Sequence, residues 1–189
     1  IQRNIASTSD LVLDLLSYSK QRAPEVEACD PNLIVAEIAE MMMTKARSHD
    51  IALTTDLDTR MGVVVLDPRT LHRSLLNLVT NALDACIFDA DTAKQFRVTI
   101  ESRKEEGGWA AFVVTDNGIG MTPKVKAKLF SSFFSTKGHR GTGLGLLVTR
   151  KLIEEHRGEI SFDSQAKAGT RFVLRLPHKP VEEQAVVPG

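Results

Sequence analysis

The stretch LHRSLLNLVTNALDACIF, residues 71–88, decides the fold. Its apolar residues recur at the three- and four-residue spacing of an amphipathic helix. Asparagine is a weak helix former, because its side chain competes for backbone hydrogen bonds, yet Asn77 and Asn81 occupy consecutive turns. At about 100° per residue, a polar wedge of this helix holds Arg73, Ser74, Asn77, Asn81 and Asp84, and the opposite side holds Leu71, Leu75, Leu78, Val79 and Ala82.

The polar wedge has two interpretations. Amide and carboxylate oxygens are hard ligands suited to Mg²⁺, which keeps several waters and bridges to the phosphates of a substrate. A solvated helix face is the alternative, although glutamate and lysine are more usual there. The helix alone does not decide between a site and a solvated face.

The rest of the chain mixes helical and strand patterns. Helical spacing covers residues 32–49, 123–130 and 144–156, and strand patterns cover 51–57, 61–67, 159–164 and 170–177. Residues 96–118 predict a hairpin that turns near Gly107. Because regular βαβ alternation is missing, we expect an α+β fold, a two-layer α/β sandwich with helices packed on one face of a mixed, mostly antiparallel sheet.

The first residues predict a domain boundary. Residues 1–22 carry an apolar helical stripe that must pack on another surface, and Pro24 and Pro31 then interrupt the helix. We expect part of a helical unit at 1–22, a linker at 23–31, one domain at 32–177 and a disordered tail at 178–189. Since the chain starts at Ile1 inside a helical pattern, we also expect a piece of a longer protein.

The composition limits the possible partners and the compartment. Lys+Arg and Asp+Glu balance at 24 each, so no net field favours nucleic acid or a membrane surface. Cys29 and Cys86 form neither a CxxC motif nor a disulfide framework, which predicts a reducing, cytoplasmic compartment. No apolar run approaches the roughly 20 residues that cross a bilayer.

Two glycine motifs carry further chemistry. DNGIGM (116–121) follows an apolar strand, and its Asp116 could accept a hydrogen bond from an exocyclic amine such as that of adenine; a plain turn is the alternative. GTGLGL (141–146) leads into a helix whose first N–H groups can bind an anion. A dinucleotide-binding loop needs a preceding strand, whereas the polar segment FSTKGHR precedes these glycines. Lys137 and Arg140 in that segment would either meet phosphate or remain solvated.

Taken in order, the asparagine helix, DNGIGM, LFSSFFSTKG (129–138), GTGLGL and AGTRFVLRLP (168–177) resemble the catalytic domain of sensor histidine kinases. That ATP-binding fold is shared with gyrase, Hsp90 and MutL. The resemblance covers about residues 31–177, and the short lid at 133–146 is most similar to kinases of the nitrogen-regulation type. It implies that residues 1–22 are the end of a dimerisation hairpin whose acceptor histidine lies upstream of Ile1.

The resemblance also implies roles for particular residues. Asn81 would coordinate Mg²⁺, and Asn77, Asn81 and Lys137 would be catalytic. Asp116 would bind the adenine amino group, Thr170 would join the hydrogen bonds around the base, and Phe130, Phe133 and Phe134 would form the hinge of the lid. The implied nucleotide-binding residues are Asn77, Asn81, Asp84, Asp116, Gly118, Ile119, Gly120, Met121, Thr136, Lys137, Gly141, Thr142, Gly143, Leu144, Gly145 and Thr170.

The residue at position 77 bears on the reaction. Relatives that hydrolyse ATP usually carry a glutamate one turn before the metal-binding asparagine, and this chain has Asn77 there. A carboxamide cannot act as a general base, whereas a neutral imidazole is already nucleophilic near pH 7. We therefore expect a histidine kinase that uses ATP and Mg²⁺, belongs to a homodimeric parent and passes the phosphoryl group to a response regulator. A serine protein kinase of the same fold and an inactive nucleotide-binding interaction module are the alternatives.

Overall fold

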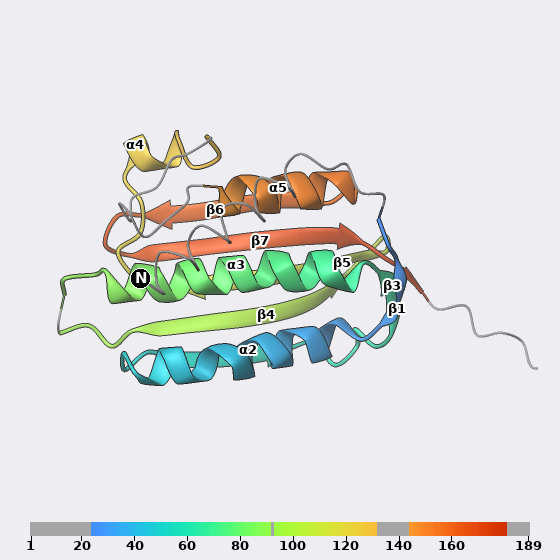
Figure 1. Ribbon diagram of the computed structural model, residues 1–189, viewed down its shortest axis with the longest axis horizontal. Coiled ribbons are helices and arrows are strands. Elements are labelled where there is room, and N and C mark those ends of the chain that lie inside the picture. The colour runs from blue at the N-terminus through green and yellow to red at the C-terminus, as the bar shows by residue number, and fades with distance from the viewer. Residues whose placement is uncertain (1–23, 92, 132–143, 181–189) are drawn as a thin grey trace, which may run out of the picture.

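The computed structural model describes residues 24–91, 93–131 and 144–180. A five-stranded sheet has the order β2 (Ala52–Leu57), β4 (Arg97–Glu105), β5 (Trp109–Asp116), β7 (Gly169–Pro177) and β6 (Glu159–Gln165). β2 runs parallel to β4, and the other neighbouring strands are antiparallel. Helices α2 (Pro31–Arg47), α3 (Pro68–Ile87) and α5 (Gly145–Glu155) lie side by side on one face of this sheet (Figure 1). The predicted two-layer α+β fold is confirmed.

The core lies between α3 and the sheet. Leu71, Leu75 and Leu78 of α3 are fully buried, as are Ile100, Phe112 and Leu174 of β4, β5 and β7. Each such side chain contributes roughly 1.5–3 kcal/mol by leaving water. Ser74 is also fully buried, so its prediction as part of the polar wedge is wrong. Its spacing of three from Leu71 and four from Leu78 places it within the apolar stripe.

The hairpin between β4 and β5 turns where the sequence predicted. Gly107 and Gly108 have φ angles of 73° and 77°, a left-handed conformation that glycine adopts without a steric cost. The short helix α4 (Pro123–Lys126) begins at the predicted residue and ends four residues before the predicted end. Residues 127–130 continue as a turn.

A second, smaller sheet corrects the predicted boundaries. It joins β1 (Glu27–Cys29), β3 (Val64–Leu66) and β8 (Lys179–Pro180), with both pairings antiparallel. β1 lies inside the predicted linker and β8 inside the predicted disordered tail. These strands have three and two residues, too few for an alternating pattern to be visible in the sequence. Residues 1–22 and 181–189 lie outside the described residues.

The helix ends fix how α3 and α5 are placed. The N-cap of α3 is Asp67, whose carboxylate accepts a hydrogen bond from the Thr70 amide at 2.9 Å. At the end of α5, Arg157 has a φ of 56°, its amide donates to the Glu154 carbonyl, and the Gly158 amide donates to Ile153, as in a Schellman motif. α3 and α5 run antiparallel, so the start of α3 lies beside the end of α5 (Figure 1).

Candidate functional site

The polar side of α3 meets α5 through two asparagines. Asn77 donates its side-chain amide to Thr149 Oγ1 at 2.8 Å, and Thr149 is 2% exposed. Asn81 in turn donates to Asn77 Oδ1 at 3.4 Å. The side-chain nitrogen of Asn81 faces Asn77, so the side-chain carbonyl oxygen of Asn81 points away from Asn77. The nitrogen and oxygen of each amide are assigned from these hydrogen bonds. Asn77 is therefore engaged at both ends of its amide, and Asn81 is oriented by it.

The start of α5 lies directly against these amides. A Cβ at Gly145 would lie 2.6 Å from Asn77 Oδ1, so a larger residue would displace Asn77. Leu144 is the N-cap of α5 and gives no side-chain cap to the first turn. The first N–H groups of an uncapped helix are suited to an anion. The structure thus places Gly145 against Asn77, and Asn81 adjoins Asn77 on α3.

Asp116 ends β5 and is nearly buried. It is 6% exposed and accepts a hydrogen bond from the Gly118 amide at 2.9 Å. Burial raises the pKa of Asp116 to about 6, although backbone hydrogen bonds from Gly118 and Thr170 and the charge of Lys94 oppose the rise. Thr170 is the residue opposite Asp116 on β7, and its hydroxyl lies 3.0 Å from Ser164 Oγ. The structure therefore places Asp116 and Thr170 together.

The loop after Asp116 is fastened to α3. A Cβ at Gly118 would overlap the backbone of Ala85, and the Ile119 amide donates to the Ala85 carbonyl at 3.0 Å. Gly120 has a φ of 60°, and a Cβ there would overlap the Gln165 carbonyl. These glycines allow the close approach that holds Asp116 near the helix of Asn81.

Lys94 holds the same loop in place through hydrogen bonds, and the sequence analysis did not predict this role. Its ammonium lies 3.2 Å from Asp89 Oδ2, 3.2 Å from the Gly118 carbonyl and 3.1 Å from the Lys167 carbonyl. It thus joins the segment before β4, the loop after β5 and the turn before β7. No local pattern marks a lysine in a polar loop as a brace. Thr149 was missed for a similar reason, because its partner Asn77 is 72 residues away.

Some of the remaining predicted residues are described by the structure, and the others are not. Asp84 pairs with Lys45 of α2 at 2.7 Å, so one oxygen of its carboxylate is engaged between the two helices. Ile119 is 45% exposed and Met121 is half-buried. Phe130 packs edge to face on Phe162 of β6 with centroids 5.8 Å apart. Phe133, Phe134, Thr136, Lys137, Gly141, Thr142 and Gly143 lie outside the described residues.

The side chains at this site fit a divalent ion that is held by few protein ligands. Within residues 24–91, 93–131 and 144–180, no three His, Cys, Asp or Glu side chains form a metal cluster. An amide oxygen such as that of Asn81 suits Mg²⁺, which is usually held by few protein ligands together with waters and phosphates.

No helix in the described part of the chain is both long and apolar enough to cross a membrane.

Comparison with known proteins identifies the family. Residues 66–180 match the family described as "Histidine kinase-, DNA gyrase B-, and HSP90-like ATPase". The chain is 27% identical over 186 residues to the signal transduction histidine-protein kinase AtoS of Escherichia coli, a match that covers 98% of this chain and 29% of AtoS. The chain belongs to this ATPase family, and its domain is homologous to the ATP-binding kinase domain of sensor histidine kinases.

Solved structures give the same result. Full-length ShkA in complex with AMPPNP matches with a TM-score of 0.81 at 22% identity, over 94% of this chain and 37% of ShkA, which supports the fold. The nucleotide-free catalytic domain of the histidine kinase ThkA matches with a TM-score of 0.69 at 29% identity, over 82% of this chain and 97% of that domain. ThkA in complex with the response regulator protein TrrA matches with a TM-score of 0.73 at 26% identity, over 93% of this chain and 48% of ThkA.

Proposed function

We propose that the domain binds Mg²⁺-ATP between α3, the loop 116–121 and the start of α5. In the complete protein it would transfer the γ-phosphoryl group to a histidine upstream of Ile1. An aspartate of a response regulator would then receive the phosphoryl group. The observation that carries this proposal is the bond between Asn77 and Thr149, because it holds the amides of α3 against the start of α5.

The base would bind at Asp116. The carboxylate lies at the end of a buried strand and can accept a hydrogen bond from the amino group of adenine. Since the pKa of Asp116 is raised to about 6, the carboxylate is mostly ionised at neutral pH and can act as an acceptor. Thr170 would contribute its hydroxyl from the neighbouring strand.

The phosphates would lie between Asn81 and the first turn of α5. Asn81 would hold Mg²⁺ through its carbonyl oxygen, and the ion would neutralise part of the phosphate charge. The N–H groups after Gly145 would donate to a phosphate oxygen. Lys137 and Gly141, Thr142 and Gly143 would complete the phosphate contacts.

Transfer to histidine fits this site better than hydrolysis. Asn77 uses its oxygen to accept from Asn81 and its nitrogen to donate to Thr149, and a carboxamide does not take up a proton at neutral pH. Water would therefore lack an activating base at this position. An imidazole nucleophile needs none, so the chain would act chiefly by positioning the phosphates and balancing their charge.

Two other functions stay open to test. A serine kinase of the same fold would give an acid-stable product, whereas phosphohistidine is acid-labile. A nucleotide-binding interaction module would bind ATP and transfer nothing. The presence of a response regulator in the ThkA structure supports the two-component assignment, as do the names of the relatives. We propose that the parent protein is a homodimer whose kinase domain lies in the cytoplasm.

The test uses the full-length protein with Mg²⁺ and labelled ATP. The wild type should form an acid-labile phosphoprotein. Asn81→Ala should abolish labelling and Asn81→Asp, which keeps an oxygen at the same place, should retain part of it. Circular dichroism of each variant shows whether the fold is kept. Undiminished labelling of a folded Asn81→Ala protein would contradict the metal assignment.

A further inference from the structure

The carboxylate of Asp67 joins three segments of the chain. Asp67 Oδ1 accepts from the Thr70 amide of α3 at 2.9 Å. Asp67 Oδ2 accepts from the Glu25 amide at 3.0 Å and lies 3.0 Å from His156 Nε2 at the end of α5. The side chains of Asp67 and His156 are 8% and 9% exposed. One oxygen atom therefore connects the segment before β1 to the end of α5.

The contact between His156 and Asp67 is a buried hydrogen-bond contact between the imidazole ring and the carboxylate. His156 Nδ1 lies 2.7 Å from the Leu152 carbonyl, and Nε2 faces the carboxylate. Both partners are hydrogen-bond acceptors, so a ring nitrogen that carries a hydrogen can donate to the partner it faces. Burial, the largest single influence, raises the pKa of Asp67, but the hydrogen bonds from Thr70, His156 and Glu25 outweigh it and leave that pKa below its usual value.

α3 and α5 are thus held together at two places. The first is the bond between Asn77 and Thr149, and the second is the pair of Asp67 and His156. The two contacts are about 15 Å apart along α3 and about 10 Å apart along α5. A helix of 11 residues behaves as a short rod, so the place of its last turn affects the place of Gly145 beside Asn77.

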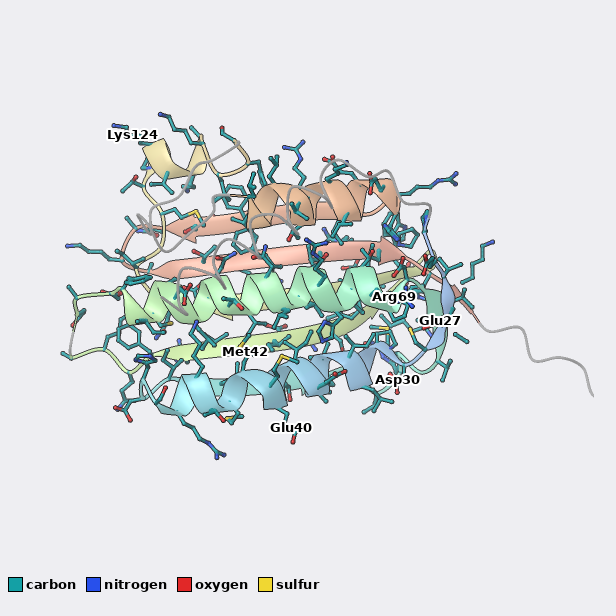
Figure 2. The ribbon with its side chains drawn as sticks, in the orientation of Figure 1. Glu27, Asp30, Glu40, Met42, Arg69 and Lys124 are labelled. Carbon is teal, nitrogen blue, oxygen red and sulfur yellow. The ribbon has the colours of Figure 1, made fainter. Side chains whose placement is uncertain are left out.

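The segment before β1 enters at the same point. Glu25 donates its backbone amide to Asp67, and its carboxylate pairs with Arg69 of α3 at 2.8 Å on the surface. β1 then pairs with β3, which leads directly to Asp67. Figure 2 labels Arg69, Glu27 and Asp30 at this end of the molecule.

We propose that Asp67 and His156 are positioning residues that hold the start of α5 against Asn77 and Asn81. Because Glu25 shares the same carboxylate oxygen, the position of the segment that enters the domain sets the geometry of the phosphate end of the site. The inference rests on the proposed binding of Mg²⁺-ATP. A change at Asp67, His156 or the Glu25 amide would alter ATP affinity without touching the nucleotide.

The first experiment compares two helix caps by calorimetry with Mg²⁺-AMPPNP. Asp67→Asn keeps an acceptor for Thr70 but turns Oδ2 into a donor that faces two other donors. Asp30→Asn is the matched control, because Asp30 also caps a helix that begins with a proline and its carboxylate accepts from the Asn32 amide of α2. We expect about fivefold weaker binding for Asp67→Asn, the lower end of typical coupling between sites, and unchanged binding for Asp30→Asn.

The second experiment uses His156→Leu and the double variant Asp67→Asn/His156→Leu. If both residues act through one contact, the loss of AMPPNP affinity in the double variant should not exceed the larger of the two losses in the single variants. Affinity for adenosine, followed by NMR, should stay unchanged in all of them, because the base end at Asp116 does not depend on α5. A variant that merely unfolds would lose both ligands together.

The third experiment addresses the entering segment. Glu25→Pro removes the amide hydrogen, whereas Glu25→Ala keeps it and removes the ion pair with Arg69. We expect weaker AMPPNP binding for Glu25→Pro and unchanged binding for Glu25→Ala. Equal affinities for the wild type, Asp67→Asn, His156→Leu and Glu25→Pro would overturn the inference and leave the proposed function intact. Absence of AMPPNP binding by the wild type would overturn both.

Discussion

Asn77 on α3 and Thr149 on α5 are joined by a 2.8 Å hydrogen bond between an amide and a nearly buried hydroxyl. The two residues are 72 positions apart in the sequence. Their contact connects the helix that carries Asn81 to the helix that follows the glycine motif. The geometry of the proposed phosphate site therefore depends on a bond that neither motif contains alone.

Removing this bond should weaken nucleotide binding. Thr149→Val has the same shape but cannot accept from Asn77, and a hydrogen bond of this kind is worth about 0.5–1.5 kcal/mol. We expect roughly three- to tenfold weaker AMPPNP binding by calorimetry. Thr80→Val is the control, since the Thr80 hydroxyl donates within α3 itself, to the Leu76 carbonyl. Equal affinities for the two variants would show that the bond does not position α5.

Binding of ATP should depend on the ionisation of Asp116. Its pKa of about 6 lies above the ordinary value, so the folded domain keeps the proton of Asp116 to a higher pH than the unfolded chain does. The stability that the raised pKa of Asp116 gives to the folded domain is fully present below about pH 4. It is lost as the pH rises through 6. Acceptance from the adenine amino group needs the carboxylate, so ATP affinity should fall as the pH drops from 7 to 5.

Asp116→Asn separates this effect from other titrating groups. The variant should bind ATP more weakly than the wild type at pH 7, because the amide can present a donor to the base amino group. Its affinity should also change little between pH 7 and 5. If Asp116→Asn keeps the wild-type pH profile of calorimetric affinity, Asp116 does not bind the base.

Gly118 should be required for the fold around the base site. A Cβ there would overlap the backbone of Ala85, which cannot move without disturbing α3. We expect Gly118→Ala to lower the free energy of unfolding by about 1–3 kcal/mol, as overpacking does. Urea denaturation measures this change. Val63→Ala is the comparison, because Val63 also stands in a loop and its side chain is 55% exposed; an equal loss in both variants would argue against the close approach.

The chain of 189 residues should bind ATP without labelling itself. The acceptor histidine is expected upstream of Ile1, and no histidine of this chain is assigned that role. Incubation with γ-³²P-ATP should give no stoichiometric label, whereas the longer protein should be labelled. Stoichiometric labelling of the short chain would place the acceptor within residues 1–189.

The long amphipathic patterns made the architecture predictable. The stripe of Leu71, Leu75 and Leu78 and the glycine turn at Gly107 were recognised because they are local and periodic. β1 and β8 were missed because strands of two or three residues depend on their partner β3 for their existence. Ser74 was misplaced because a small polar residue can be buried within an apolar stripe.

The site was predictable where motifs carry it and unpredictable where tertiary contacts complete it. Asn77, Asn81, Asp116 and Gly145 were predicted as site residues from their motifs and from the family resemblance. Three further residues contact partners that are distant in the sequence, namely Thr149, Lys94 and His156. Spacing patterns within the sequence do not predict such contacts. The sequence also gave no sign that Asp84 would pair with Lys45 of α2.

The central claim is that Asn81 holds a divalent ion and Asp116 holds the base of one bound nucleotide. A crystal structure of the chain with AMPPNP and Mg²⁺ tests it most directly. We expect the ion about 2.1 Å from Asn81 Oδ1, the adenine amino group within hydrogen-bond distance of Asp116, and the phosphates at the start of α5. A nucleotide bound elsewhere, or one whose metal has no contact with Asn81, would contradict the account.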